Sequence, residues 1–77
     1  MELEGNYSGF DFSGQDLSHY VLKGNFTGAD FRGATLRGAD LRGGKFAGAN
    51  FAEADLRGAR LRLSFRFQVR SLRHAKM

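Results

Sequence analysis

The sequence contains no cysteine and no proline. Without cysteine the chain cannot form disulfides, and nothing points to a thiolate metal site or a redox role. It also lacks an apolar run approaching the ~20 residues of a membrane span. Its first four residues, Met1-Glu2-Leu3-Glu4, are acidic and do not resemble a signal peptide. We therefore expect a single cytoplasmic domain, since 77 residues suffice for no more than one.

Glycine and phenylalanine are unusually common. The chain has 11 glycines, eight phenylalanines and two tyrosines. Glycine at this level fits either disorder or a backbone that turns often, and the aromatic residues argue against disorder.

From Gly24 onward the chain divides into pentads: GNFTG, ADFRG, ATLRG, ADLRG, GKFAG, ANFAE, ADLRG and ARLRL. We call the large apolar residue of each pentad its centre. A small residue, glycine or alanine, stands two positions before every centre. The centres are Phe26, Phe31, Leu36, Leu41, Phe46, Phe51, Leu56 and Leu61.

A period of five fits neither a helix nor a flat strand. On a helix successive centres would spiral around the axis, and on a strand they would alternate between faces. The pattern fits a chain that runs briefly extended and then bends, so that four bends close a square coil. Glycine tolerates the dihedral angles of such bends. The glycines expected to bend are Gly28, Gly33, Gly38, Gly43, Gly48 and Gly58.

Four pentads per coil would stack residues about 20 apart, and the matching centres agree in type. The N-terminal part joins this scheme if one residue is missing near Ser18 and His19. Larger residues then occupy its inward small positions, as is common in terminal repeats: these are Phe10, Gln15 and His19. The predicted columns are Tyr7-Phe26-Phe46, Phe12-Phe31-Phe51, Leu17-Leu36-Leu56 and Val21-Leu41-Leu61.

These repeats resemble the pentapeptide-repeat family, whose pattern is close to A(D/N)LxG. The resemblance covers about residues 5–63, and AD(L/F)RG at 29–33, 39–43 and 54–58 is its most specific part. It implies an all-β fold, a right-handed quadrilateral β-helix, here of about three coils over residues 1–63.

The pentads stop after Leu61, and apolar residues then alternate with polar ones up to Val69. Such alternation predicts a half-buried strand. This strand would either cap the last coil or pair with a second copy of the chain. Its contact residues would be Leu63, Phe65, Phe67 and Val69. We treat residues 64–77 as a basic strand and tail, with 71–77 frayed.

Charge is divided unevenly along the chain. Residues 1–59 carry six Lys/Arg and all eight Asp/Glu, a balance of −2, whereas residues 60–77 carry six Lys/Arg and no acid, a balance of +6. The acids on the coils form a candidate partner-binding surface, but they also fit solvated repeat positions neutralised by neighbouring arginines. These acids are Asp11, Asp16, Asp30, Asp40, Glu53 and Asp55.

The sequence offers no catalytic or cofactor motif. His19 and His74 are far apart and have no cysteine beside them. The segment 38–45 resembles a phosphate loop, but Gly43 is followed by glycine and no Ser/Thr follows Lys45. We expect a protein that is not an enzyme and needs no cofactor or metal.

The family resemblance implies a precedent for function, because some pentapeptide-repeat proteins mimic DNA and occupy the DNA site of gyrase-like enzymes. The first hypothesis is therefore an inhibitor that competes with DNA for a basic groove, of the phage anti-CRISPR type first and a gyrase inhibitor second. Nucleic-acid binding through Arg66, Arg70 and Arg73 with Phe65 and Phe67 ranks lower, because the alternation places these aromatics toward a core. A plain interaction scaffold is the third hypothesis.

Overall fold

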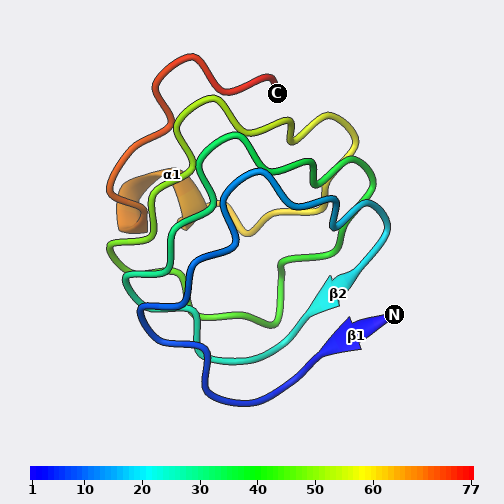
Figure 1. Cartoon of the computed structure of the whole chain (residues 1–77), viewed down its shortest axis with the longest axis vertical. Coiled ribbons are helices and arrows are strands. Elements are labelled where there is room, and N and C mark those ends of the chain that lie inside the picture. Colours follow the sequence, from blue (N-terminus) through cyan, green and yellow to red (C-terminus); the bar gives the residue numbers. More distant parts are fainter.

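The computed structural model describes all residues 1–77, and its backbone winds into a stack of four-sided turns (Figure 1). Only three regular elements stand out: β1 (Glu2–Leu3), β2 (Val21–Leu22) and α1 (Phe65–Gln68). β1 and β2 pair in parallel, with Glu2 opposite Val21 and Leu3 opposite Leu22. No helix is long and apolar enough to cross a membrane.

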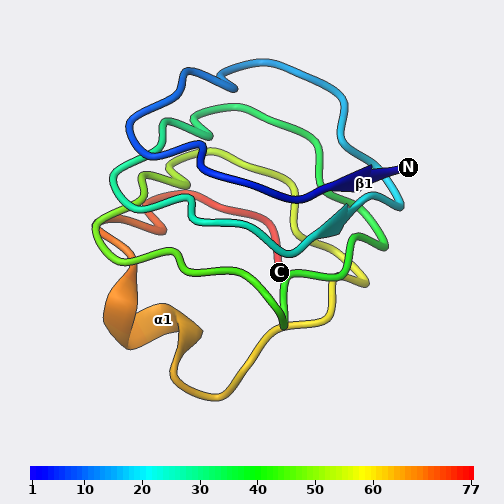
Figure 2. The same cartoon turned by 90° about the horizontal axis from the view of Figure 1, so that it is seen from below.

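Parallel pairing continues on every side of the coil, one residue at a time. Asp11 pairs with Asp30, Asp30 with Asn50, and Asn50 with Ser71, so this side has four levels. The levels follow one another along the axis from the N-terminal end to the C-terminal end (Figure 2). Because each side is so short, the ladder consists mostly of isolated bridges rather than strands.

The bends follow from the residues after each centre. The N–H of Ala29 donates to the carbonyl of Phe26 at 3.0 Å, and Gly28 between them has φ +68°. A positive φ at the third position is the mark of a type II turn, which favours glycine. Gly33, Gly38, Gly48 and Gly58 share this conformation, as expected. Gly43 also lies at a bend, where the N–H of Gly44 donates to the carbonyl of Leu41 at 3.2 Å, but its φ is not positive.

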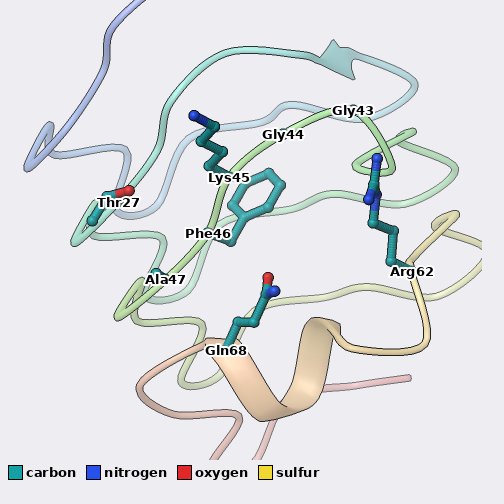
Figure 3. Close-up of a pocket in the computed structure, with 8 residues that line it drawn as sticks. All are labelled: Thr27, Gly43, Gly44, Lys45, Phe46, Ala47, Arg62 and Gln68. Carbon is teal, nitrogen blue, oxygen red and sulfur yellow. The ribbon is translucent and has the colours of Figure 1, made fainter.

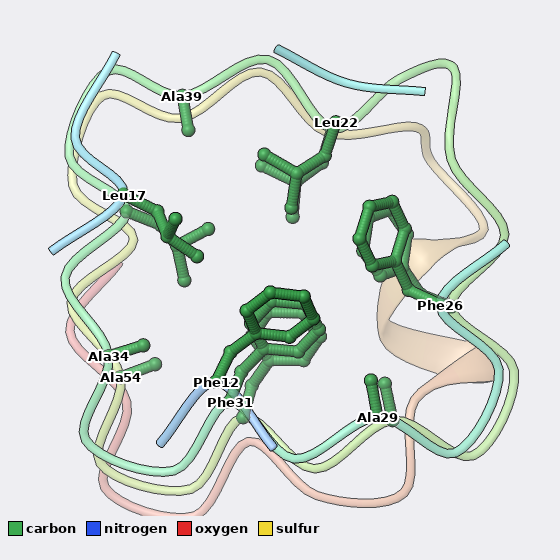
Figure 4. Close-up of a cluster of buried hydrophobic side chains, with 14 of the residues drawn as sticks. Phe12, Leu17, Leu22, Phe26, Ala29, Phe31, Ala34, Ala39 and Ala54 are labelled. Carbon is green, nitrogen blue, oxygen red and sulfur yellow. The ribbon is translucent and has the colours of Figure 1, made fainter. Parts of the chain in front are cut away.

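The core consists of the centres and of the alanines two positions before them (Figure 4). The predicted aromatic columns are present. Tyr7 and Phe26 stack with ring centroids 5.3 Å apart, and Phe26 and Phe46 with 5.2 Å. In the neighbouring column Phe31 stacks on Phe51 at 4.6 Å with planes 4° apart. Each aromatic pair contributes about 0.5–1.5 kcal/mol beyond the burial of its area.

One centre of the first coil was assigned wrongly. Val21 pairs with Asp40, which places Leu22 opposite Leu41, and Leu22 is fully buried while Val21 is half-buried. The fourth column therefore holds Leu22 instead of Val21. The missing residue consequently lies between Leu22 and Phe26, not near Ser18 and His19.

His19 is correspondingly at a bend and not at an inward position. Its φ of +64° matches that of Gly38, the corner residue one level below. The inward position is taken by Tyr20, which is half-buried near the open N-terminal end. A large residue fits there because the first level has no level above it to crowd the ring.

The predicted strand over residues 61–69 is absent, and α1 occupies its place. Within this short helix only Phe65 is buried, and its ring packs against Phe46 and Phe51. The Phe65 carbonyl accepts the N–H of Val69 at 3.2 Å, which closes the single turn of α1.

Residues 71–77, expected to be frayed, rejoin the coil. Phe51 donates its N–H to the carbonyl of Ser71 at 2.9 Å, and Leu56 donates to Lys76 at 2.7 Å. Leu72 also packs partly buried against the core. These bonds extend the stack on two sides beyond Leu61, where the pentads end in the sequence.

Candidate macromolecule-binding surfaces

The Asp or Asn that precedes most centres has a local structural role. Its side-chain oxygen accepts the backbone N–H two residues later, as in Asp11 with Ser13 (2.9 Å) and Asn50 with Ala52 (3.0 Å). Asp and Asn form this local bond readily, which explains why they recur at this position. The aspartates proposed as a partner surface thus also hold the turns.

Three of these aspartates are neutralised by the arginine two positions later. Each arginine reaches both carboxylate oxygens, a geometry that strengthens charge-assisted hydrogen bonds. The shortest N–O distances are 2.7 Å for Asp30–Arg32, 2.9 Å for Asp40–Arg42 and 2.7 Å for Asp55–Arg57. The alternative of locally neutralised repeat positions is confirmed for these three.

The same contacts set the ionisation of the pairs. The side-chain hydrogen bond from Arg42 lowers the pKa of Asp40 from its ordinary 3.8 to about 2. The bonds from Arg32 and Arg57 lower the pKa of Asp30 and Asp55 in the same way. All three carboxylates are therefore charged at neutral pH, but each has a cation attached.

Asp11, Asp16 and Glu53 have no arginine or lysine partner and are exposed. Hydrogen bonds from Ser13 and Ser18 lower the pKa of Asp11 and Asp16, so both stay ionised. Asp11 and Asp16 lie on adjoining sides of the first coil, and Glu53 lies at a bend of a later one with φ +62°. The free negative surface is thus smaller than the six acids of the sequence suggested.

The four residues predicted to cap or dimerise do not share one face. Phe65 is 4% exposed and Val69 is half-buried, whereas Leu63 is 97% and Phe67 85% exposed. Phe65 therefore packs inside the coil, and Leu63 and Phe67 face solvent. This overturns the argument that the alternation directs both Phe65 and Phe67 toward a core.

Six cations follow residue 59, and we call them the basic end. All six are exposed, and none forms an ion pair with a carboxylate. They lie on α1, on the segments flanking it and on the last half level of the coil. The members of the basic end are Arg60, Arg62, Arg66, Arg70, Arg73 and Lys76.

A cavity of about 430 Å³ adjoins the basic end (Figure 3). The Gly43–Ala47 segment forms one wall, and the side chains of Arg62 and Gln68 approach it from the last coil and from α1. Lys45 stands where most other pentads have Asp or Asn. This site was not predicted from the sequence, although a cation at that repeat position is a visible departure from the pattern.

No three His, Cys, Asp or Glu side chains gather closely enough to hold a metal ion. His19 and His74 both occupy bends, with φ of +64° and +59°.

Residues 25–62 match the family described as pentapeptide repeats, in eight copies. The chain belongs to this pentapeptide-repeat family, whose repeats imply a right-handed quadrilateral β-helix. Proteins of the family are generally structural or interaction proteins and not enzymes.

Two solved structures are similar to the chain. A pentapeptide-repeat protein from Nostoc PCC 7120 is 26% identical, with 88% of this chain and 78% of that one covered and a TM-score of 0.35. A pentapeptide-repeat protein from the thylakoid lumen of Arabidopsis thaliana is 30% identical, with 92% and 60% covered and a TM-score of 0.26. No curated protein matches the chain.

Proposed function

We propose that the chain is a non-catalytic binding protein whose basic end contacts the phosphate backbone of a nucleic acid. The observation that carries the proposal is that all six cations of the basic end lack a carboxylate partner. In contrast, Arg32, Arg42 and Arg57 on the coils are each held by an aspartate. The positive charge available to a ligand is therefore concentrated at one end of the molecule.

Phe67 supports the same proposal. Its side chain is 85% exposed and lies next to Arg66 in α1. Exposed aromatic rings among cations stack on the bases of single strands, each contributing about 1–3 kcal/mol. From the sequence, Phe67 was expected to face a core, which ranked nucleic-acid binding lower. Because Phe67 is exposed, that objection no longer holds.

A labelled single-stranded oligonucleotide, titrated with the protein at several salt concentrations, tests the proposal. Replacing Arg66, Arg70 and Arg73 by Gln should weaken binding at least tenfold and reduce the slope of log affinity against log salt by about 2–3. A matched control replaces Arg32, Arg42 and Arg57 by Gln, which removes the same charge elsewhere. Absence of binding at low salt, or equal losses in the two variants, would reject the proposal.

A second candidate is the inhibitor that mimics DNA, of the anti-CRISPR type or acting on gyrase. It is favoured by Asp11 and Asp16, which are exposed, ionised and without a cationic partner. It ranks second because duplex DNA carries roughly eight phosphates over the ~14 Å rise of three coils. Three of the six candidate acids are already neutralised by arginines.

The mimic would be tested by competition with DNA for a DNA-handling complex. Replacing Asp11 and Asp16 by Asn keeps the oxygen that accepts the turn N–H and removes both charges. The matched control replaces Asp30 and Asp55, whose charges are already paired. Inhibition that survives in the Asp11/Asp16 variant would exclude this candidate.

A further inference from the structure

We propose that the cavity between the Gly43–Ala47 segment, Arg62 and α1 is a binding site for a single phosphate group. The proposal rests on two backbone donors without partners, one where α1 replaces the next level of the coil and one where Lys45 replaces the usual Asp or Asn. It does not depend on the proposed function, because the same site could take a free phosphate.

The first donor is the N–H of Phe46. Centres elsewhere donate to the level that follows, as Phe26 does to Lys45 at 2.7 Å and Phe51 to Ser71 at 2.9 Å. Phe46 has no such bond. The neighbouring donors Gly48 and Phe51 bond to carbonyls 20 residues later, Gln68 and Ser71, so the acceptor for Phe46 would be the carbonyl of Arg66. Arg66 lies in α1, and no bond joins the two groups.

The second donor is the N–H of Ala47. At the same position of other pentads an Asp or Asn oxygen accepts this group, for example Asn25 for Thr27 and Asn50 for Ala52, both at 3.0 Å. In this pentad the residue is Lys45, which has no acceptor, and Ala47 makes no such bond. An anion bound here would take the place of both missing acceptors.

Unpaired cations and an amide stand around these two donors. Lys45 and Arg62 line the cavity and have no carboxylate partner. Arg62 is held in place through its Nε, which donates to the carbonyl of Arg42, so its terminal amino groups remain available. The side chain of Gln68 is directed from α1 toward the Gly43–Phe46 segment (Figure 3).

This set of groups matches the chemistry of phosphate. Successive backbone N–H groups in a concavity bind anions, and arginine pairs with two phosphate oxygens at once. Gly43 and Gly44 carry no side chain, and a Cβ at Gly44 would lie only 2.5 Å from the Phe46 ring. Glycine at position 44 is therefore required by the packing of the buried Phe46 ring, and it fixes the course of the segment that forms the cavity wall.

The test follows the backbone amide signals by NMR while inorganic phosphate is added, with sodium chloride at matched ionic strength as the control. The amides of Phe46 and Ala47 should shift with phosphate and not with chloride. Lys45→Gln and Arg62→Gln should each weaken phosphate binding about two- to fivefold, the range of exposed ion pairs. Arg37→Gln, an unpaired cation outside this cavity, should have no effect.

Ala47→Pro provides a second, independent test. It removes the N–H at the second position of a turn whose third residue, Gly48, has φ +70°, where proline is favoured. The variant should fold and lose phosphate binding. Retained binding, or shifts confined to Arg66, Arg70 and Arg73, would overturn the proposal.

A short oligonucleotide without terminal phosphate distinguishes the source of the phosphate. If it shifts Phe46 and Ala47 together with the basic end, the site takes a backbone phosphate of a nucleic acid. If inorganic phosphate alone shifts Phe46 and Ala47, the site serves a free phosphate and stands even where the nucleic-acid proposal fails.

Discussion

The ring of Phe65 meets the ring of Phe51 edge-on, with centroids 5.1 Å apart and planes at 63°. It meets Phe46 in the same manner at 5.7 Å and 67°. Phe65 thus closes both aromatic columns at once, at the level where the pentads have ended. One side chain from a helix of four residues covers the aromatic half of the core's C-terminal end.

Replacing Phe65 by Ala should lower the free energy of unfolding by about 3 kcal/mol, the lower part of the range for buried phenylalanine. Phe67→Ala, two residues away and 85% exposed, should change it by no more than about 0.5 kcal/mol. Urea denaturation of both variants measures the difference. If Phe65→Ala does not fold, Phe65→Leu should fold with an intermediate loss; equal effects at the two positions would contradict the packing described.

The tail shows why a strand was predicted and a helix formed. Alternation of apolar and polar residues over Leu61–Val69 fits a strand, but it also fits a helix that buries a single side chain. Phe65 alone covers the ends of the two aromatic columns. Nothing in the spacing shows that Phe65 uses its carbonyl within α1. The cavity beside Lys45 left one visible signal in the sequence, a cation where most pentads have Asp or Asn, but the spacing does not show that the Phe46 N–H lacks an acceptor.

The repeat predicted the structure of the coil more reliably than the alternation predicted that of the tail. A five-residue spacing fits a coil that bends after each pentad and keeps all centres inside, and the columns ending in Phe46, Phe51 and Leu56 follow from it. The fourth column failed at Val21 because Val21 and Leu22 are both apolar, and spacing alone cannot choose between them. Backbone pairing of Val21 with Asp40 decides the register.

Acid should destabilise the fold through Asp40. Its pKa is lower in the folded chain, about 2, than the ordinary 3.8, because it accepts hydrogen bonds from Arg42. The folded state therefore binds fewer protons, so the contribution is complete above about pH 4 and is lost as the pH falls toward about 2. Asp40→Asn keeps the turn bond and removes the titration.

Urea midpoints of the wild type and Asp40→Asn, measured at low salt across this range, test the effect. The stability of the wild type should fall more steeply with decreasing pH than that of the variant. High salt should reduce the difference, because the pair is exposed to solvent. Parallel pH profiles, or an Asp40 carboxyl that titrates near 3.8 by NMR, would show that the ion pair does not form in solution.

Deleting Gly43 should be tolerated. The chain passes from Leu22 to Phe26 in four residues and from Leu41 to Phe46 in five, around the same corner of the coil. The deletion gives the lower level the spacing that the upper level already has. Circular dichroism and a cooperative thermal transition should remain, with a loss of roughly 2 kcal/mol or less.

Deletion of Gly33 is the matched control. Gly33 has φ +67° and lies at a corner of the coil. The centres on the two sides of this corner are five residues apart in every level. Removing it shifts all later centres out of register with the levels above, so this variant should not fold. Loss of folding in both deletions would show that the fourth corner is no more adaptable than the others.

Gly24→Ala should detach the N-terminal segment specifically. A Cβ at Gly24 would lie 2.1 Å from the carbonyl oxygen of Gly5. This oxygen is part of the backbone, so it cannot move aside as the end of a side chain can. The carbonyls of Met1, Leu3 and Gly5 would then release their donors. Hydrogen exchange should therefore quicken at the amides that these carbonyls accept, which belong to Val21, Lys23 and Asn25.

Gly28→Ala separates this local effect from backbone strain. Gly28 has φ +68° with nothing within 4 Å of an added Cβ, so its substitution should cost about 1 kcal/mol through conformation alone. This loss lowers the free energy of unfolding of the whole coil. Hydrogen exchange at Val21, Lys23 and Asn25 should therefore quicken no more than at other amides. Because a Cβ at Gly24 would meet the backbone of Gly5, selective exchange in Gly24→Ala would show that the first level can detach from the second while the rest of the coil stays folded.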